Sequence, residues 1–220
     1  MTTTQIDAFA PATEMLRALR AGEVSAVELL ELHLRRIERH NPALNAIVTP
    51  CYEDARRTAE AADAARARGE DGPLLGLPLT IKDCIDVAGL RGTAGVVDFA
   101  ERCPEEDSRV AARVRAAGAV LLGKTNIPPM AGDWQSDNPV FGRTNNPWDL
   151  ERTPGGSTGG GAAALAAGLA ALEFGSDIGG SIRVPAAFCG VYGHRPSETA
   201  LPRSGHFPGT PLPNAATVMG

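Results

Sequence analysis

Two glycine-rich segments, each built around a serine, constrain what this 220-residue chain can fold into. The first, residues 154–161, reads Pro-Gly-Gly-Ser-Thr-Gly-Gly-Gly and contains Ser157. The second, residues 175–186, reads Gly-Ser-Asp-Ile-Gly-Gly-Ser-Ile-Arg-Val-Pro-Ala and contains Ser181. Glycine lets the backbone approach another group closely and adopt torsion angles that other residues avoid. Both segments are therefore predicted to be tight turns that present a serine hydroxyl to a substrate.

A lysine is predicted to end a buried strand upstream of both serine segments. Residues 78–81 form the run Pro-Leu-Thr-Ile, and Lys82 follows it directly. Burial disfavours the charged form of an amine and lowers its pKa, so a buried lysine can act as a base. The alternative is a structural salt bridge from Lys82 to Asp83 or Asp86. The serine segments favour the first interpretation, a Ser–Ser–Lys hydrolase site.

The second serine segment is also predicted to stabilise negative charge. It leads into a short helix, and the first backbone N–H groups of a helix lack partners within it. These donors can point at one spot beside the Ser181 hydroxyl, which makes Ser181 a candidate nucleophile. Loss of one oxyanion-hole donor typically lowers the rate about 10²–10³-fold. The predicted donors are the N–H groups of Ile178, Gly179, Gly180 and Ser181.

Nucleotide binding is disfavoured as the purpose of the first serine segment. A P-loop requires Lys-Ser or Lys-Thr after its last glycine, but Ala162 follows Gly161 here. Residues 159–164 fit the G-x-G-x-x-A spacing of a dinucleotide site, yet no convincing strand precedes them. A purely structural glycine-rich turn is the remaining alternative.

Histidine is a weaker candidate for the base than Lys82. His33 and His40 are expected in an outer helix, and His194 is expected where a strand meets a turn. The fourth histidine is His206. None has an acidic partner at a motif-like spacing, so a Ser-His-Asp triad is weakly supported.

The order of predicted elements indicates an α/β fold behind an outer helical layer. Residues 1–70 are predicted to form that layer, and residues 71–200 the catalytic core segment. Alternating strands and helices are typical of a mixed, largely parallel sheet covered by helices on both faces. Residues 126–156 should be a long irregular loop that lines the site. Helices are expected near 25–41, 52–68, 108–117, 158–169 and 181–189, and strands near 46–49, 78–81, 119–122, 171–175 and 191–194.

The last residues are predicted to leave the sheet uncovered. Residues 201–220 read as an irregular tail without a periodic pattern. An uncovered sheet exposes apolar surface and strand edges. We therefore expect one domain of which the C-terminal half is missing but required, and we expect the 220 residues alone not to be independently stable.

Composition and charge exclude several classes of partner. The formal net charge of −5 disfavours nucleic acid and anionic membranes, because both attract a basic face. The first residues do not resemble a signal peptide, and the longest apolar run, 162–174, is too short to span a bilayer. Four cysteines without a C-x-x-C pair favour a reduced, cytoplasmic setting. No metal or cofactor is implied.

Most of the region from residue 74 to 197 resembles the amidase signature family. The matches include Gly-Leu-Pro-Leu-Thr-Ile-Lys-Asp around Lys82, Lys-Thr-Asn at 124–126, Asn-Pro-Trp at 146–148 and both serine segments. The resemblance implies that Ser181 is the acylated nucleophile, Ser157 a relay serine after a cis peptide bond, and Lys82 the base. It further implies that Thr158, Asp177 and Arg183 brace the loops.

The resemblance also implies a function, the hydrolysis of a C–N bond. Met130, Trp134 and Gly156 fall where the family binds its substrate, which favours a bulky or aryl amide, anilide or carbamate, as in an aryl acylamidase or urethanase. One alternative is a glutaminase-type subunit for tRNA-dependent amidation, which would need partner chains. The other is an inactive scaffold fragment. Self-association as a homodimer is left open.

Overall fold

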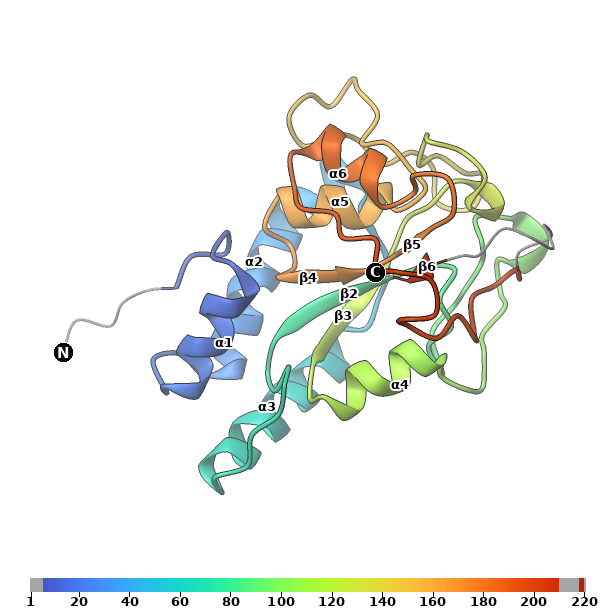
Figure 1. Cartoon of the computed structure of the whole chain (residues 1–220). Coiled ribbons are helices and arrows are strands. Elements are labelled where there is room, and N and C mark those ends of the chain that lie inside the picture. The colour runs from blue at the N-terminus through green and yellow to red at the C-terminus, as the bar shows by residue number, and fades with distance from the viewer. Residues whose placement is uncertain (1–5, 210–217, 220) are drawn as a thin grey trace.

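The computed structural model describes residues 6–209, 218 and 219. A four-stranded sheet with the strand order β1-β3-β2-β4 lies at its centre (Figure 1). Strand β2 runs parallel to β3 and β4, whereas β1 runs antiparallel to β3. The predicted mixed, largely parallel sheet is thereby confirmed. The strands are β1 (Ile47–Pro50), β2 (Pro78–Lys82), β3 (Val120–Thr125) and β4 (Leu172–Phe174).

Helices cover both faces of this sheet, because successive side chains of a strand point to opposite sides. Leu79 and Ile81 of β2 pack in one apolar cluster with helix α4 (Arg109–Ala116). Val120 and Leu122 of β3 pack in a second cluster with α2 (Ala26–Leu44) and α5 (Gly159–Ala166). Helices α1 (Ala12–Arg20) and α3 (Tyr52–Ala67) join this second cluster. Figure 1 shows α5 and α4 on opposite sides of the sheet.

Helix α2 continues past Asn41-Pro42, where the sequence predicts its end. The helix tolerates Pro42 because a proline this close to its C-terminus removes only one hydrogen bond of the last turn, and it ends at Leu44. The Asn41 side chain accepts hydrogen bonds from the N–H groups of Ala46 and Ile47, which holds the chain that follows. No helix of the described residues is long and apolar enough to cross a membrane.

One further expectation about the C-terminal region is wrong, and a second needs a small correction. Residues 191–194 do not form a strand. The tail after residue 200 is not wholly irregular, since β6 (Val218–Met219) pairs antiparallel with β5 (Ser176–Asp177) and His206 forms an isolated bridge with Ile85. These contacts use backbone groups, which leave no side-chain pattern in the sequence. Residues 210–217 of the predicted tail lie outside the described residues.

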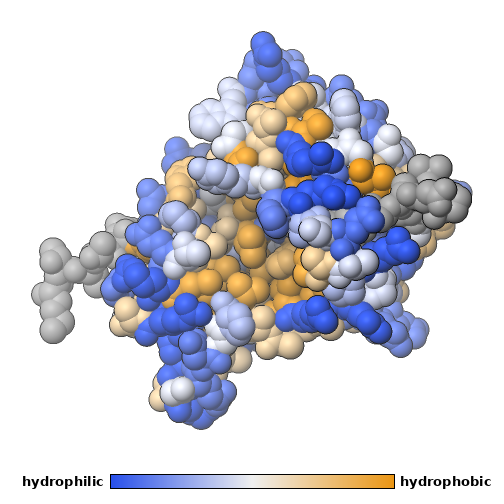
Figure 2. All heavy atoms as spheres, viewed as in Figure 1, coloured by the Kyte–Doolittle hydropathy of each residue, from blue (hydrophilic) through white to orange (hydrophobic). Residues whose placement is uncertain are grey.

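Strand β4 forms one edge of the sheet. Figure 2 shows an apolar surface in the middle of the same view, rimmed by hydrophilic side chains. A hollow of about 140 Å³ beside β4 is lined by residues of α5, β4 and the segment around α6 (Arg183–Cys189), including Leu165, Leu172 and Tyr192.

Candidate active site

Lys82 ends β2 with its amine buried beneath the two serine segments. Its Nζ lies 2.7 Å from Ser157 Oγ, 3.1 Å from Ser176 Oγ and 3.3 Å from the Ser176 carbonyl oxygen. The Lys82 side chain has no exposed surface, and Ser157 is 1% exposed. The fold therefore brings together a lysine and a serine that lie far apart in the sequence.

The backbone of the first serine segment is held by close packing of its glycines. The Gly156–Ser157 peptide bond is cis, where the family resemblance places a cis bond. A side chain at Gly156 would meet the backbone of Trp134, and one at Gly160 would meet the backbone of Asn126. The glycines thus let the segment and the start of α5 lie directly against neighbouring loops. This contact fixes Ser157 over the end of β2.

Burial is the main cause of the lowered pKa of the Lys82 amine. The acidic groups Cys84, Glu173, Asp177 and Asp83 act in the opposite direction without reversing the shift. The lowered pKa favours the neutral amine that a proton acceptor requires.

Neither acidic neighbour of Lys82 in the sequence forms a salt bridge with it. The Asp83 carboxylate accepts hydrogen bonds from the N–H and hydroxyl groups of Thr93. The Asp86 carboxylate pairs with Arg102 at 2.7 and 2.8 Å. The salt-bridge alternative for Lys82 is therefore not what the structure contains.

The second serine segment is organised by the buried carboxylate of Asp177. Its oxygens accept hydrogen bonds from the N–H groups of Gly180 and Ile182, each at 2.9 Å, and from the Arg183 guanidinium at 2.8 and 3.1 Å. Burial acts to raise the pKa of Asp177, but these hydrogen bonds outweigh burial and lower the pKa well below its ordinary value. The ionised carboxylate thus fixes the turn that carries Ser181.

The hydrogen bond to Asp177 changes the set of oxyanion donors. Gly180 was expected to be one of them, but its N–H already points at the Asp177 carboxylate. The N–H groups of Gly179 and Ser181 meet no acceptor within residues 6–209. Gly180 is therefore removed from the expected set, which leaves Ile178, Gly179 and Ser181.

Thr158 connects the two serine segments. Its N–H donates to the Ser181 carbonyl at 3.0 Å, and its hydroxyl donates to the Ser176 carbonyl at 3.4 Å. A side chain at Gly175 would collide with Thr158, so the strand end and the turn are in close contact. The threonine thus links the backbone on both sides of the site.

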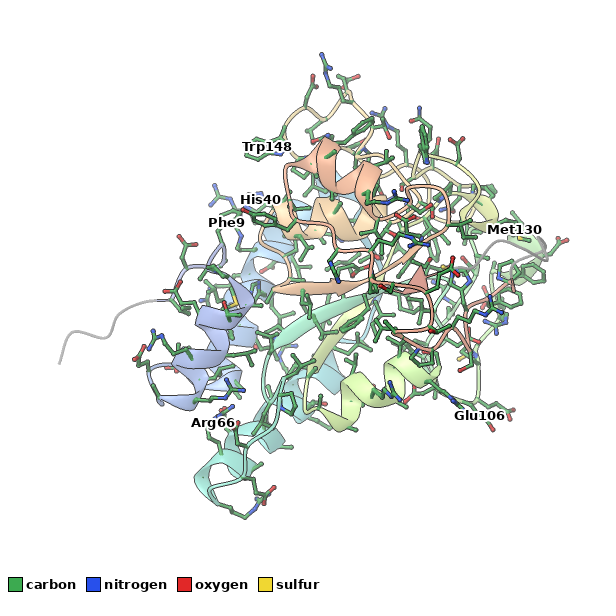
Figure 3. The ribbon with its side chains drawn as sticks, in the orientation of Figure 1. Phe9, His40, Arg66, Glu106, Met130 and Trp148 are labelled. Atoms are coloured by element: carbon green, nitrogen blue, oxygen red, sulfur yellow. The ribbon has the colours of Figure 1, made fainter. Side chains whose placement is uncertain are left out.

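A cavity of about 340 Å³ opens over these residues. Ser157, Ser176 and Ser181 line it together with Met130 and Trp134, whose side chains are 49% and 53% exposed. Figure 3 shows Met130 at the rim of the molecule, far from Trp148. Gly156 does not line the cavity; it supports the wall by packing against the backbone of Trp134.

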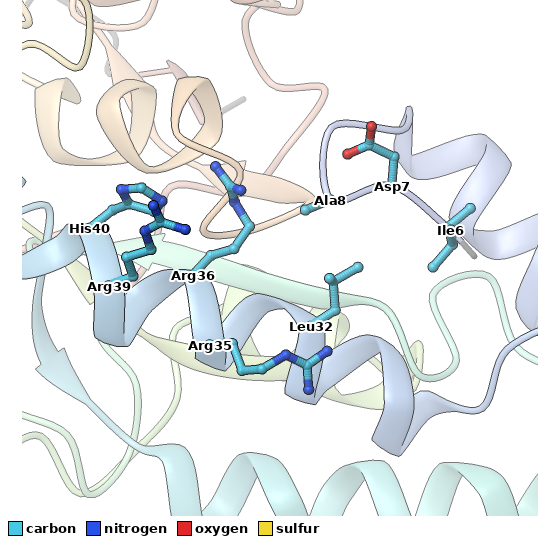
Figure 4. Close-up of a pocket in the computed structure, with 8 residues that line it drawn as sticks. All are labelled: Ile6, Asp7, Ala8, Leu32, Arg35, Arg36, Arg39 and His40. Carbon is cyan, nitrogen blue, oxygen red and sulfur yellow. The ribbon is translucent and has the colours of Figure 1, made fainter.

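A second hollow, of about 510 Å³, lies between α2 and the N-terminal segment (Figure 4). Among the described residues it is lined by three arginines, His40, Asp7 and apolar side chains, with no serine, cysteine or lysine. Arg36 in its wall donates to the Ala167 carbonyl and stacks over Phe9, so it binds the N-terminal segment to the core. This hollow therefore belongs to the helical layer and its N-terminal segment.

Three groups near Lys82 were not predicted from the sequence to have a role. Ser176 contacts the lysine directly, and the Ser176 hydroxyl lies 2.9 Å from His206 Nε2. Glu173 is buried on β4, accepts a hydrogen bond from Thr125, and has a pKa raised to about 7 by burial. A role for Ser176 could have been suspected from the sequence, because Ser176 lies in the second serine segment directly before Asp177. The histidine reaches the site only through the tail, which carries no pattern.

We expect Asp177→Asn to destabilise the protein by about 2–3 kcal/mol, the usual effect of losing a charged hydrogen-bond partner. The folded-state pKa of Asp177 is lowered, so its stabilisation is complete above the ordinary pKa of about 3.9 and is lost as the pH falls through the folded-state value. Thermal unfolding of wild type and variant in the full-length natural protein at pH 7 and at pH 3 measures this. An equal difference in stability between wild type and variant at both pH values would contradict this expectation.

The fold agrees with comparisons to known proteins. The family model for Amidase matches residues 28–220, and the chain belongs to this family of amidase signature enzymes. It is 47% identical over 188 residues to a glutamyl-tRNA(Gln) amidotransferase subunit of Roseiflexus sp. (strain RS-1), covering 86% of this chain and 39% of that protein.

Two solved structures show the same fold. A bacterial aryl acylamidase of the amidase signature family superposes with a TM-score of 0.82 at 34% identity, covering 86% of this chain and 40% of that one. A 6-aminohexanoate cyclic dimer hydrolase superposes with a TM-score of 0.78 at 38% identity, covering 84% of this chain and 38% of that one. The chain spans less than half the length of the curated relatives it matches, and it corresponds to the N-terminal part of the family domain.

Proposed function

We propose that this chain carries the catalytic centre of an amidase that hydrolyses a C–N bond through an acyl-enzyme on Ser181. One observation carries the proposal: the buried Lys82 amine lies 2.7 Å from Ser157 Oγ, beneath a cavity that both serines line. A serine hydroxyl needs a base to become a nucleophile, and a neutral buried lysine supplies one without histidine. No metal or cofactor enters this mechanism.

The reaction proceeds by proton transfer along Ser181, Ser157 and Lys82. The neutral amine accepts the Ser157 proton while Ser157 accepts the Ser181 proton, and the Ser181 oxygen attacks the carbonyl carbon. The N–H groups of Ile178, Gly179 and Ser181 stabilise the oxyanion. The proton returns through Ser157 to the leaving nitrogen, the C–N bond breaks, and water then hydrolyses the acyl-enzyme.

The cavity wall supports a bulky or aryl amide, anilide or carbamate as the substrate. Met130 and Trp134 present large apolar surfaces beside the serines. Glutamine hydrolysis within an amidotransferase is the second candidate, because the identity to a glutamyl-tRNA(Gln) amidotransferase subunit is as high as 47%. That candidate needs partner chains, whereas the first needs only a small molecule.

Two parts of the proposal concern the protein as a whole. The exposed edge of β4 and the apolar surface around it support a further segment of the same domain that completes the sheet and the pocket. The four cysteines are free, which supports a reduced, cytoplasmic setting. The alternative is an inactive scaffold, which amide hydrolysis by the full-length natural protein would exclude.

A substrate panel tests the proposal in the full-length natural protein. We expect kcat/KM for an aryl anilide or aryl carbamate to exceed that for glutamine at least about 100-fold, a difference of about 2.7 kcal/mol in transition-state binding. Trp134→Ala should lower the aryl value about tenfold, whereas Trp148→Ala, outside the cavity, is the matched control. A preference for glutamine would favour the amidotransferase, and no hydrolysis of any amide would favour the scaffold.

A further inference from the structure

The hydrogen-bond chain at Lys82 does not end at the amine but continues to His206. Lys82 Nζ lies 3.1 Å from Ser176 Oγ, and Ser176 Oγ lies 2.9 Å from His206 Nε2. The His206 Nδ1 atom lies 3.2 Å from the Pro208 carbonyl oxygen. His206 also lines the cavity with the three serines. A continuous path therefore runs from the cavity wall through Ser176 to Lys82 and Ser157.

Two carbonyl oxygens, those of Pro208 and Ser176, constrain the directions of the hydrogen bonds in this chain. A carbonyl can only accept, so Nδ1 of His206 carries the proton and donates it to Pro208. In the neutral ring Nε2 then has a lone pair that faces the Ser176 hydroxyl at 2.9 Å and Cys84 Sγ at 3.3 Å, and we take Ser176, the nearer group, as its donor. The oxygen of Ser176 is left to accept from Lys82, as does the Ser176 carbonyl at 3.3 Å.

These directions determine where the lone pair of the amine points. A neutral amine has two N–H bonds and one lone pair. Both N–H bonds of Lys82 are used by the hydroxyl and carbonyl oxygens of Ser176. The remaining contact, at 2.7 Å, is with Ser157 Oγ, so the lone pair faces the hydroxyl from which it must take a proton.

We propose that Ser176 and His206 are positioning residues that aim the lone pair of Lys82 at Ser157. The inference rests on the proposed function, in which Lys82 is the base. Neutral His206 anchors the Ser176 hydroxyl away from the amine. Without that acceptor the Ser176 hydroxyl is free to donate to Lys82 and to compete with Ser157 for the lone pair.

Protonation of His206 has the same effect as its removal. The imidazolium carries a proton on Nε2, cannot accept from Ser176, and turns the Ser176 hydroxyl toward Lys82. The titratable groups around His206 are Cys84, whose Sγ lies 3.3 Å from Nε2, Lys82, and Asp133 in the wall of the same cavity. Burial opposes protonation, but Cys84 more than offsets burial and raises the pKa of His206. Activity should therefore require a second deprotonation besides that of Lys82.

The pH dependence of kcat/KM between about pH 5.5 and 10 tests the inference in the full-length natural protein. We expect the acidic limb of the wild type to contain two ionisations. In His206→Gln, whose amide oxygen can accept from Ser176 at every pH, one ionisation should disappear while much of the plateau rate remains. In His206→Leu the plateau kcat should fall at least tenfold. Ser176→Ala removes the competing hydroxyl itself, so this variant should also lose the His206 ionisation.

His194→Leu is the matched control, because His194 is exposed and lies outside the cavity of the serines. Thermal unfolding shows whether each variant folds. An unchanged plateau and unchanged acidic limb in both His206 variants, in an enzyme that Lys82→Ala inactivates, would overturn the inference and leave the proposed function intact. A wild type without amide hydrolysis would instead contradict the proposed function.

Nitrogen NMR of labelled His206 provides a readout that does not depend on turnover. We expect the neutral ring to carry its proton on Nδ1, and we expect Lys82→Met to change the pKa of His206. A neutral ring protonated on Nε2 would overturn the inference even if no substrate were known.

Discussion

Ser181→Ala is expected to abolish amide hydrolysis, with kcat falling about 10⁴–10⁶-fold, while the protein folds normally. The magnitude is that seen when a serine nucleophile is removed from a catalytic triad. The Ser181 hydroxyl forms no hydrogen bond with the described residues, so its loss leaves no buried partner unsatisfied. The measurement, in the full-length natural protein, is kcat for an aryl anilide together with the thermal unfolding midpoint of wild type and variant.

Ser197→Ala is the control for this experiment, because Ser197 is exposed and lies outside the cavity. It should keep the wild-type rate. Retention of wild-type turnover by pure Ser181→Ala protein would show that the nucleophile lies elsewhere.

Lys82→Arg is expected to be almost inactive at every pH. Arginine keeps its positive charge at any working pH and cannot accept the Ser157 proton. Lys82→Ala should lower kcat about 10²–10⁴-fold, the usual contribution of a general base. Because Lys82 must be neutral to act, wild-type activity should rise with pH through its folded-state pKa, which burial lowers. Lys82→Ala should lose that part of the ascending limb.

The pH profiles of kcat/KM for the wild type and both Lys82 variants check this expectation. An active Lys82→Arg variant with an unchanged profile would show that another group is the base. The structure places His194 on the surface and His206 in the cavity. His206 would therefore be the group to test.

Local sequence pattern predicted the parts of the site that are made by short segments. Glycines around Ser157 and Ser181 indicate turns, and the apolar run before Lys82 indicates a buried strand. The order of strands and helices likewise predicted a mixed sheet with helices on both faces. These features depend on neighbours in the chain or on side-chain periodicity, which a sequence displays directly.

Features that depend on distant backbone contacts could not be predicted in this way. The bridge that brings His206 under the site uses main-chain groups of Ile85, and β6 pairs with β5 in the same manner. The use of the Gly180 N–H by Asp177 was missed because a carboxylate on β5 folds back over the following turn. The strand expected at residues 191–194 has no neighbour among the described strands.

Chemical trapping of the acyl-enzyme tests the central claim most directly. The full-length natural protein is incubated with an O-aryl carbamate, whose C–O bond breaks so that the aryl oxide leaves and a slowly hydrolysed carbamoyl group stays on the nucleophile. The labelled peptide is identified by mass spectrometry. We predict one carbamoyl group on Ser181 in the wild type and none in Ser181→Ala. A carbamoyl group on Ser157 or Cys84, or hydrolysis without any trapped intermediate on Ser181, would contradict the proposed mechanism.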